Sequence, residues 1–439
     1  MTARPPRPRL LWVTYDFPPR QAAGAFRPVK LYKFLDKSQV DIEFLTSRAE
    51  SFAGGEHMLD DVEPKPVVYR AGGTPVDRLF EGIKNRLVKL GLARAGRRTL
   101  WERIGYRLVL PFAFPDKHVV WGLRSALRAL WLHLRRPLSV IYTTSFPESA
   151  HLPGMLLHLF GVRWVADYRY GGPMWTTAMV FGRKSLWGER MALAFQAYVL
   201  RHADLVITQS DTLRENFIAR FGLDANRVAA LPNGYDEDGF HDFGSHAAPF
   251  ARAAGELHLL HLGGDWYPDA SQIANLDDLL TRLASETGHK VVVHALGVDI
   301  LGAQQRVTAT AYHYQFHGSV PHVEALKYLA AVDAFILSMI AETAGHGSVA
   351  GWLPAKLWEY LRAGKAILLL GPQDDAWRYA QACGAVIYLG GAATPLQLPA
   401  AHVLAAIEAG ASHPERAHDH EWGARALTFD ELLKRVLNP

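Results

Sequence analysis

The chain of 439 residues contains a single cysteine, Cys383. One thiol cannot form a disulfide within the chain, so the sequence predicts a fold held by noncovalent packing in a reducing compartment such as the cytoplasm. No run of eighteen apolar residues occurs, and no membrane-spanning helix is predicted. The basic, proline-rich N-terminus lacks the apolar core of a signal peptide.

Acidic residues are scarce in one segment, residues 84–107. This segment has eight basic residues and one acid, a net charge of +7, so the remainder of the chain carries −3. Apolar residues interleave with the basic ones, which predicts a basic amphipathic helical pair that can lie on anionic lipid. An ordinary basic solvent face is the alternative. No nucleic-acid motif accompanies the charge, so a nucleic-acid partner is not expected.

Hydrophobic residues make up 49% and charged residues 21% of the chain, as in globular proteins with large cores. The length predicts two domains, or three. Short apolar runs alternate with helical patterns, and this alternation predicts parallel, doubly wound sheets. In the first half the expected strands are residues 9–15, 40–45, 67–69, 139–143, 163–168, 203–208 and 227–231, with helices that include 29–35 and 149–160. Ser210 is the expected N-cap of a further helix that runs through Ala219.

A segment rich in Gly, Ala, His and Pro, residues 232–256, interrupts this pattern, which then restarts at the strand 257–263. The sequence therefore predicts an N-terminal Rossmann-like domain over 1–238 and a C-terminal one over 239–415. The last segment, 416–439, is expected to cross back to the first domain through a helix at 421–437. Ligands bind at the carboxyl edges of such sheets, at topological switch points.

The most informative segment is residues 353–370, LPAKLWEYLRAGKAILLL. Pro354 is expected in the first turn of a helix, Gly364 in its left-handed cap, and AILLL in a buried strand. Lys356 and Glu359 are three residues apart and share one helical face. They suit a nucleotide diphosphate, because the cation faces phosphates and the carboxylate accepts hydrogen bonds from a ribose diol. A solvated helical pair is the alternative.

Further short motifs follow one another along the chain. In order they are Asp16-Phe17-Pro18-Pro19 with Gly24 and Arg27; Phe114-Pro115-Asp116 with Trp121; Thr144-Ser145-Phe146-Pro147 with His151; Ala166-Asp167-Tyr168-Arg169 with Trp175; Ala203-Asp204-Leu205-Val206; and Pro232-Asn233-Gly234-Tyr235-Asp236. Together with Lys356 and Glu359, this order resembles the family four retaining glycosyltransferases, and within them a bacterial branch that builds exopolysaccharide, capsule or O-antigen.

The resemblance implies the GT-B fold: two facing Rossmann-like domains, a central cleft and a C-terminal crossing helix. It also implies transfer of a sugar from a nucleotide sugar, UDP- or GDP-linked, with retention and without a cofactor or metal ion. The implied acceptor is a glycan or a polyprenyl-linked sugar. An enzyme of this kind is expected in the cytoplasm, where it can meet a lipid-linked acceptor at the inner face of the membrane.

The residue chemistry and the resemblance together assign candidate roles. His151, Asp167 and Arg169 are candidate catalytic residues, and Arg27 and Tyr170 are candidate acceptor contacts. The candidate donor contacts are Gly24, Gly263, Gly264, Gly347, Ser348, Lys356 and Glu359. The resemblance places the nucleotide base near residues 317–320. Structural alternatives remain open: plain turns for the glycines, a surface salt bridge for Arg27, a core histidine for His151, and a structural pair of Asp167 with Arg169.

Three positions depart from the family pattern. Gly351 stands where many members carry a second Glu, and Tyr170 stands where the branch has Asp. The family pattern has an Arg or Lys after the glycine that Gly264 matches, and here Asp265 occupies that position. Two alternative functions therefore stay open: a degenerate protein that binds a nucleotide sugar or a partner transferase, and another GT-B activity such as nucleotide-sugar epimerisation.

Overall fold

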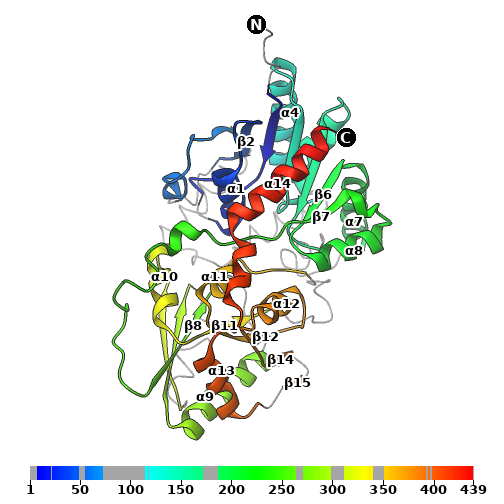
Figure 1. Cartoon of the computed structure of the whole chain (residues 1–439). Coiled ribbons are helices and arrows are strands. Elements are labelled where there is room, and N and C mark those ends of the chain that lie inside the picture. Colours follow the sequence, from blue (N-terminus) through cyan, green and yellow to red (C-terminus); the bar gives the residue numbers. More distant parts are fainter. Residues whose placement is uncertain are drawn as a thin grey trace, which may run out of the picture. The chain divides into compact units, whose positions relative to one another are not determined.

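The computed structural model divides the chain into two compact units (Figure 1). The first contains the described residues up to Leu231 together with those from Ala426 onward, and the second contains the described residues from Pro232 to Arg425. The structure describes residues 7–20, 22–48, 55–72, 114–116, 118–171, 186–263, 270–297, 311–339, 351–391, 394–395 and 398–438.

The first unit is built on a seven-stranded sheet with the order β3-β2-β1-β4-β5-β6-β7, all pairs parallel. The strand order reverses between β1 and β4, which is the topological switch point of this sheet. The strands are β1 Arg9–Val13, β2 Asp41–Ser47, β3 Val67–Ala71, β4 Val140–Thr144, β5 Arg163–Tyr168, β6 Leu205–Thr208 and β7 Val228–Ala230.

Helices connect these strands. Ser210 caps one of them, because its hydroxyl accepts from the Leu213 amide, as the sequence predicts. The helices of this unit are α1 Ala23–Phe34, α4 Val119–Arg135, α5 Leu152–His158, α7 Leu186–His202 and α8 Asp211–Phe221, with 3₁₀ turns at Glu56–Leu59, Glu148–His151 and Ala225–Arg227.

The position of α1 differs from the prediction of a helix over 29–35. The helix begins at Ala23 and contains Pro28 in its interior. Proline is usually confined to the first turn, because it lacks an N–H for the carbonyl four residues earlier. Here that carbonyl belongs to Gly24, and the side chain of Arg169, directly after β5, supplies the missing donor.

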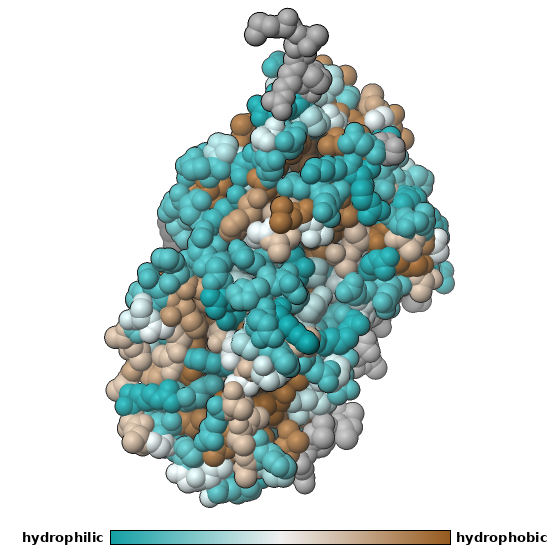
Figure 2. Space-filling model, viewed as in Figure 1, coloured by the Kyte–Doolittle hydropathy of each residue, from teal (hydrophilic) through white to brown (hydrophobic). Residues whose placement is uncertain are grey.

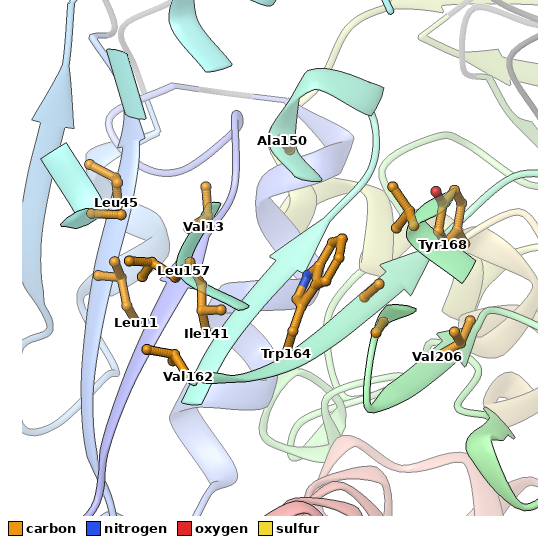
Figure 3. Packing of buried hydrophobic residues seen from close by; sticks show 14 of the residues in the cluster. Leu11, Val13, Leu45, Ile141, Ala150, Leu157, Val162, Trp164, Tyr168 and Val206 are labelled. Carbon is orange, nitrogen blue, oxygen red and sulfur yellow. The ribbon is translucent and has the colours of Figure 1, made fainter. Parts of the chain in front are cut away.

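The core of the first unit lies between the sheet and its helices (Figure 3). Ile141 on β4 lies between Leu11 on β1 and the fully buried Trp164 on β5. The indole N–H of Trp164 donates to the Thr143 hydroxyl at 2.8 Å. On the final helix, α14 (Trp422–Leu437), the buried Phe429 contacts the rings of Trp12 and Tyr142.

The second unit has a six-stranded parallel sheet with the order β10-β9-β8-β11-β12-β13, so its order reverses between β8 and β11. The strands are β8 Glu256–Leu262, β9 Lys290–Leu296, β10 His313–Gly318, β11 Ala334–Ser338, β12 Ala366–Leu370 and β13 Val386–Tyr388, with a small ladder of β14 Gly390–Gly391 and β15 Thr394–Pro395. The helices are α9 Ala270–Thr287, α10 His322–Ala331, α11 Lys356–Ala363, α12 Asp375–Ala382 and α13 Ala400–Ala409, with 3₁₀ turns at Glu237–Phe240 and Pro414–His420.

The two sheets confirm the predicted α/β architecture of two Rossmann-like domains. Gly364 ends α11 in the left-handed region with φ 69°, and all five residues of β12 are buried, as predicted. Among the described helices, none combines the length and hydropathy needed to span a bilayer. The face drawn in Figure 2 is mostly hydrophilic, with small apolar areas between the polar ones.

Gly154 in α5 allows this helix to pack closely on the sheet. A Cβ at this position would collide with the Trp164 indole, which has no free volume to move into. We expect Gly154→Ala to lower the free energy of unfolding by about 1–3 kcal/mol through overpacking. Urea denaturation of the variant, with Gly423→Ala in α14 as the control, measures this. The nearest atom to a Cβ on Gly423 is a side-chain oxygen at 3.4 Å, so an equal loss in both variants would contradict the account.

Candidate functional site

The carboxyl end of β8 lies at the switch point of the second sheet and carries the first group of candidate residues. β8 pairs with β11 only at Leu259 and Leu260, although β8 continues to Leu262. On the side of β8 that faces β11, the backbone of Leu262 is therefore left without a strand partner. Ligands of doubly wound proteins bind at such openings in the sheet.

Two side chains of α11 satisfy the Leu262 backbone. Its N–H donates to the Tyr360 hydroxyl at 2.9 Å, and its carbonyl accepts a hydrogen bond from the Lys356 ammonium. A buried backbone group without a partner would cost about as much as a lost hydrogen bond. The first turn of α11 is thereby held against the end of β8, and Lys356 is its first residue.

Lys356 occupies an environment that disfavours its charge. Burial lowers its pKa to about 7, so that both protonation states are populated near neutral pH. Its Nζ lies 3.4 Å from Nε2 of His261, a histidine with no exposed surface. Burial, and then the neighbouring Lys356 charge, hold the pKa of His261 well below its usual value. His261 was not among the predicted site residues, although the strand sequence LHLLHL contains two histidines.

Glu359 has a partner that the sequence did not reveal. Its carboxylate lies 2.6 Å from Nε2 of His322, the first residue of α10. Both side chains are accessible, with 20% of Glu359 and 45% of His322 exposed. Because α10 follows β10 and α11 follows β11, the N-termini of both helices lie at the carboxyl edge of the sheet. The same edge of the sheet therefore carries the positive N-terminal ends of the two helices and the side chains of Lys356 and Glu359.

Of the predicted glycine contacts in this unit, the structure describes one. The Gly263 amide donates to the Leu296 carbonyl at 2.6 Å and extends the ladder between β8 and β9. This corrects the expectation that the Gly263 N–H faces a phosphate, because the amide is already bonded. Gly264, Gly347 and Ser348 lie outside the described residues.

In the first unit, Arg27 and Asp167 form a buried ion pair. Nε and one terminal nitrogen of Arg27 donate to the two carboxylate oxygens of Asp167 at 3.1 and 3.2 Å, and the side chains are 2% and 1% exposed. The Thr144 hydroxyl also donates to Asp167 at 2.8 Å. Burial, and then the Asp167 charge, raise the pKa of the adjacent Tyr142. Asp167 is therefore paired with Arg27 in the interior, which differs from both structural alternatives, a surface salt bridge of Arg27 and a pair of Asp167 with Arg169.

Arg169 contacts the start of α1. One terminal nitrogen donates to the Gly24 carbonyl at 3.0 Å, the carbonyl that Pro28 leaves without a helical donor. A Cβ on Gly24 would collide with the Asp16 carboxylate and approach the Arg169 guanidinium, so this position requires a residue without a side chain. The structure thus brings together Gly24 and Arg169, two of the predicted site residues, and adds Asp16.

His151 is fully buried at the end of the 3₁₀ turn that precedes α5. Its Nδ1 lies 2.8 Å from the Thr143 hydroxyl, and its ring stacks on Tyr168 with centroids 4.6 Å apart. Burial lowers the pKa of His151 to about 3, so the ring is neutral. Nε2 has no hydrogen-bond partner in the described part of the chain. These contacts match the core-histidine alternative more closely than an exposed sugar contact.

Two buried carboxyl groups support the turn that carries His151. Asp116 accepts from the amide and the hydroxyl of Ser149, each at 2.8 Å. Burial, and then the Asp116 charge, raise the pKa of Glu148 to about 8, so Glu148 is protonated at neutral pH. Asp116 belongs to a motif quoted above, whereas nothing in the sequence pointed to Glu148. Tyr170 follows at the end of β5 and is partly buried, and the basic segment 84–107 lies outside the described residues.

A family model matches the N-terminal part of the chain. Residues 35–234 match the family model of the glycosyl transferase 4-like domain. A search of curated protein sequences finds no match. The N-terminal half of the chain is thus similar to a glycosyl transferase 4-like domain.

Solved structures match along almost the entire chain. Sucrose-phosphate synthase from Thermosynechococcus elongatus has a TM-score of 0.63 at 14% identity, covering 98% of this chain and 99% of that one. A glycosyltransferase from Rickettsia africae has a TM-score of 0.58 at 10% identity, covering 98% and 99%. A UDP-N-acetylglucosamine 2-epimerase described as putative, from Listeria monocytogenes, has 0.55 at 9%, covering 98% and 96%. At these identities the likeness shows the fold, which is GT-B.

The ion pair of Arg27 and Asp167 makes a stability prediction. Asp167→Ala leaves the Arg27 guanidinium buried without its counter-charge, and we expect it to lower the free energy of unfolding by about 3–5 kcal/mol. The double variant Arg27→Met/Asp167→Leu removes both charges and should recover most of this loss. Urea denaturation measures both. A loss in the double variant as large as in Asp167→Ala would contradict the assignment of the cost to an unpaired buried charge.

Proposed function

We propose that the protein is a glycosyltransferase that moves a sugar from a nucleotide diphosphate donor to an acceptor. The observation that carries this proposal is the edge formed by Lys356, His261, Glu359 and His322 at the switch point of the second sheet. The match to the glycosyl transferase 4-like domain and the GT-B fold support it. In this account the second unit binds the donor and the first unit binds the acceptor.

Lys356 is proposed to bind the donor diphosphate. When the nucleotide leaves the sugar, negative charge grows on the diphosphate and must be stabilised by fixed cations and backbone dipoles. Lys356 is partly buried at the first turn of α11, so its charge acts in a medium of low dielectric. Glu359 is proposed to accept hydrogen bonds from the ribose diol in exchange for its contact with His322. Retention at the anomeric carbon and independence of metal ions belong to this proposal.

Arg169 is proposed to face the acceptor from the first unit. Its Nε is buried and has no hydrogen-bond partner among the described residues, so a donor group is left for a ligand. The ion pair of Arg27 with Asp167 and the turn that carries His151 position this edge. The acceptor is proposed to be a polyprenyl-linked glycan in surface polysaccharide synthesis, met at the cytoplasmic face of the membrane through the basic segment 84–107.

A nucleotide-sugar-binding protein without turnover is the second candidate. Gly351, which replaces the second Glu of many relatives, has φ 80°, a conformation that a glutamate would adopt only with strain. The local backbone is therefore built for glycine. Release of free nucleotide from a nucleotide sugar distinguishes the candidates, because only the transferase breaks the sugar–phosphate bond.

A binding screen against UDP-, GDP-, ADP- and dTDP-sugars tests the donor site. We expect one nucleotide to bind and Lys356→Met to weaken it tenfold to a hundredfold, since a hydrogen bond to a charged group contributes about 1.5–3 kcal/mol. Glu359→Gln should weaken binding about tenfold. Lys327→Met, which removes a cation paired with Glu324 on α10, serves as the control and should bind normally. Binding that is unaffected by both site variants, or no binding at all, would contradict the proposal.

The pKa of Lys356 predicts how nucleotide affinity depends on pH. A bound diphosphate stabilises the ammonium form, so binding takes up a proton whenever the pH exceeds the pKa of the free enzyme, about 7. We expect the dissociation constant to rise by up to tenfold per pH unit above 7. Calorimetric titration between pH 6.5 and 9 measures this, and the profile of Lys356→Met should be flat. An equal slope in both proteins would assign the effect to another group.

A further inference from the structure

Three histidines on adjacent strands of the second unit form a continuous chain of hydrogen bonds. Nδ1 of His258 on β8 lies 3.0 Å from Nε2 of His294 on β9, and Nδ1 of His294 lies 3.0 Å from Nε2 of His317 on β10. Glu256 and Tyr328 stand at its two ends, 3.2 Å from Nε2 of His258 and 3.3 Å from Nδ1 of His317. We call the three imidazoles the histidine ribbon.

The rings of the histidine ribbon lie nearly in one plane. Neighbouring rings are inclined by 13° and 21°, with centroids 5.3 Å apart in each pair. These separations equal those of imidazoles joined edge to edge by a hydrogen bond rather than stacked face to face. Phe250 covers one face of the ribbon, with its ring 4.6 Å from His258 and 4.1 Å from His294. The ribbon is therefore a packed element of the core.

The carboxylate at one end fixes the direction of every hydrogen bond. Glu256 accepts from Lys290 at 2.6 Å and from the Ala253 amide at 2.8 Å, and these bonds lower its pKa to about 2. An ionised carboxylate can only accept, so His258 must donate through Nε2. His258 Nδ1 then accepts from His294, and His294 Nδ1 accepts from His317. Each imidazole is neutral with its proton on Nε2, and the Tyr328 hydroxyl donates to His317.

This polarity limits how many protons the ribbon can hold. One added proton can occupy Nδ1 of His317 if the Tyr328 hydroxyl turns to accept, and all contacts are kept. A second proton places one N–H opposite another at a separation of 3.0 Å, and that hydrogen bond is lost. We propose that the histidine ribbon is an acid-sensitive switch. While the ribbon is neutral it holds β8, β9, β10 and α10 together, and when more than one of its histidines is protonated the β10 edge of the sheet opens.

Charged groups on the neighbouring elements surround the ribbon. Lys290 faces Glu256, Arg252 is paired with Asp333 beside His258, Glu324 faces Tyr328 on α10, and the exposed His313 lies on β10. Lys365, before β12, lies near Asp333. A cavity of about 560 Å³ is lined by Phe250 and by all three histidines.

The sign of the pH effect follows from burial. Burial lowers the pKa of all three histidines, that of His294 to about 3, whereas unfolded histidines titrate near 6.5. The contribution of the ribbon to the free energy of unfolding is therefore fully present above pH 6.5. It is lost as the pH falls below 6.5, because the unfolded chain then binds more protons than the folded chain. Each histidine that stays neutral in the fold lowers the folding equilibrium constant about tenfold per pH unit.

The switch acts on the proposed donor edge. His317 directly precedes Gly318 at the end of β10, and α10 begins at His322, the partner of Glu359. Opening this edge in acid would release the segment 317–320 and the Glu359 contact together. This consequence rests on the proposed function, whereas the titration of the ribbon does not, so the switch is tested without nucleotide.

Nitrogen-15 NMR of the histidine side chains in the full chain tests the ribbon directly. At pH 7.5 we expect three neutral rings with the proton on Nε2, each coupled to the next. Between pH 6.5 and 5 at most one proton should enter the ribbon. Independent titration of all three rings near pH 6.5, or protons on Nδ1 at pH 7.5, would overturn the proposal. This measurement needs no variant.

A matched pair of variants tests the coupling to stability. His294→Gln removes the centre of the ribbon on β9, and His313→Gln removes an exposed histidine from the neighbouring edge strand, β10. On acidification from pH 6.5 to 5, the folding equilibrium of the native chain and of His313→Gln should weaken about tenfold more per pH unit than that of His294→Gln. Amide exchange should show β10 losing protection before β12. Equal pH slopes in all three proteins, or uniform loss of protection, would refute the switch.

Discussion

The donor edge depends on the two backbone groups of Leu262. β8 and β11 separate before β8 ends, and the Leu262 N–H and carbonyl would be left without partners if α11 did not supply Tyr360 and Lys356. This requirement places a cation in a partly buried position beside a neutral histidine. We propose that the arrangement that completes the sheet also binds the anionic donor, since a phosphate can replace the carbonyl that now accepts from Lys356.

In the first unit, too, a side chain takes the place of a missing backbone hydrogen-bond partner. Pro28 has no N–H for the Gly24 carbonyl, and Arg169 donates in its place. The start of α1 is thereby joined to the carboxyl end of β5, next to the buried pair of Arg27 and Asp167. In both units an irregularity of the backbone at the carboxyl edge of the sheet is satisfied by a cationic side chain, and these are the cations to which we assign ligand binding.

Sequence patterns predicted much of the fold, because alternation, caps and glycines are local signals. Ser210 and Gly364 were placed correctly, and the strand at 163–168 was found with both of its ends. The predicted start of α1 was wrong, because tertiary contacts offset the usual cost of placing Pro28 inside a helix. The pairing of Arg27 with Asp167, 140 residues away, and the histidine ribbon across three strands could not be predicted, since both depend on strand register. Lys356 and Glu359 were selected from spacing, but their partners His261 and His322 were not.

A crystal structure of the chain with a bound nucleotide diphosphate tests the central claim most directly. The account predicts that the diphosphate contacts the Lys356 ammonium at the end of β8, and that the ribose hydroxyls have displaced His322 from Glu359. A nucleotide bound elsewhere, with Lys356 still donating to the Leu262 carbonyl and Glu359 still paired with His322, would contradict it.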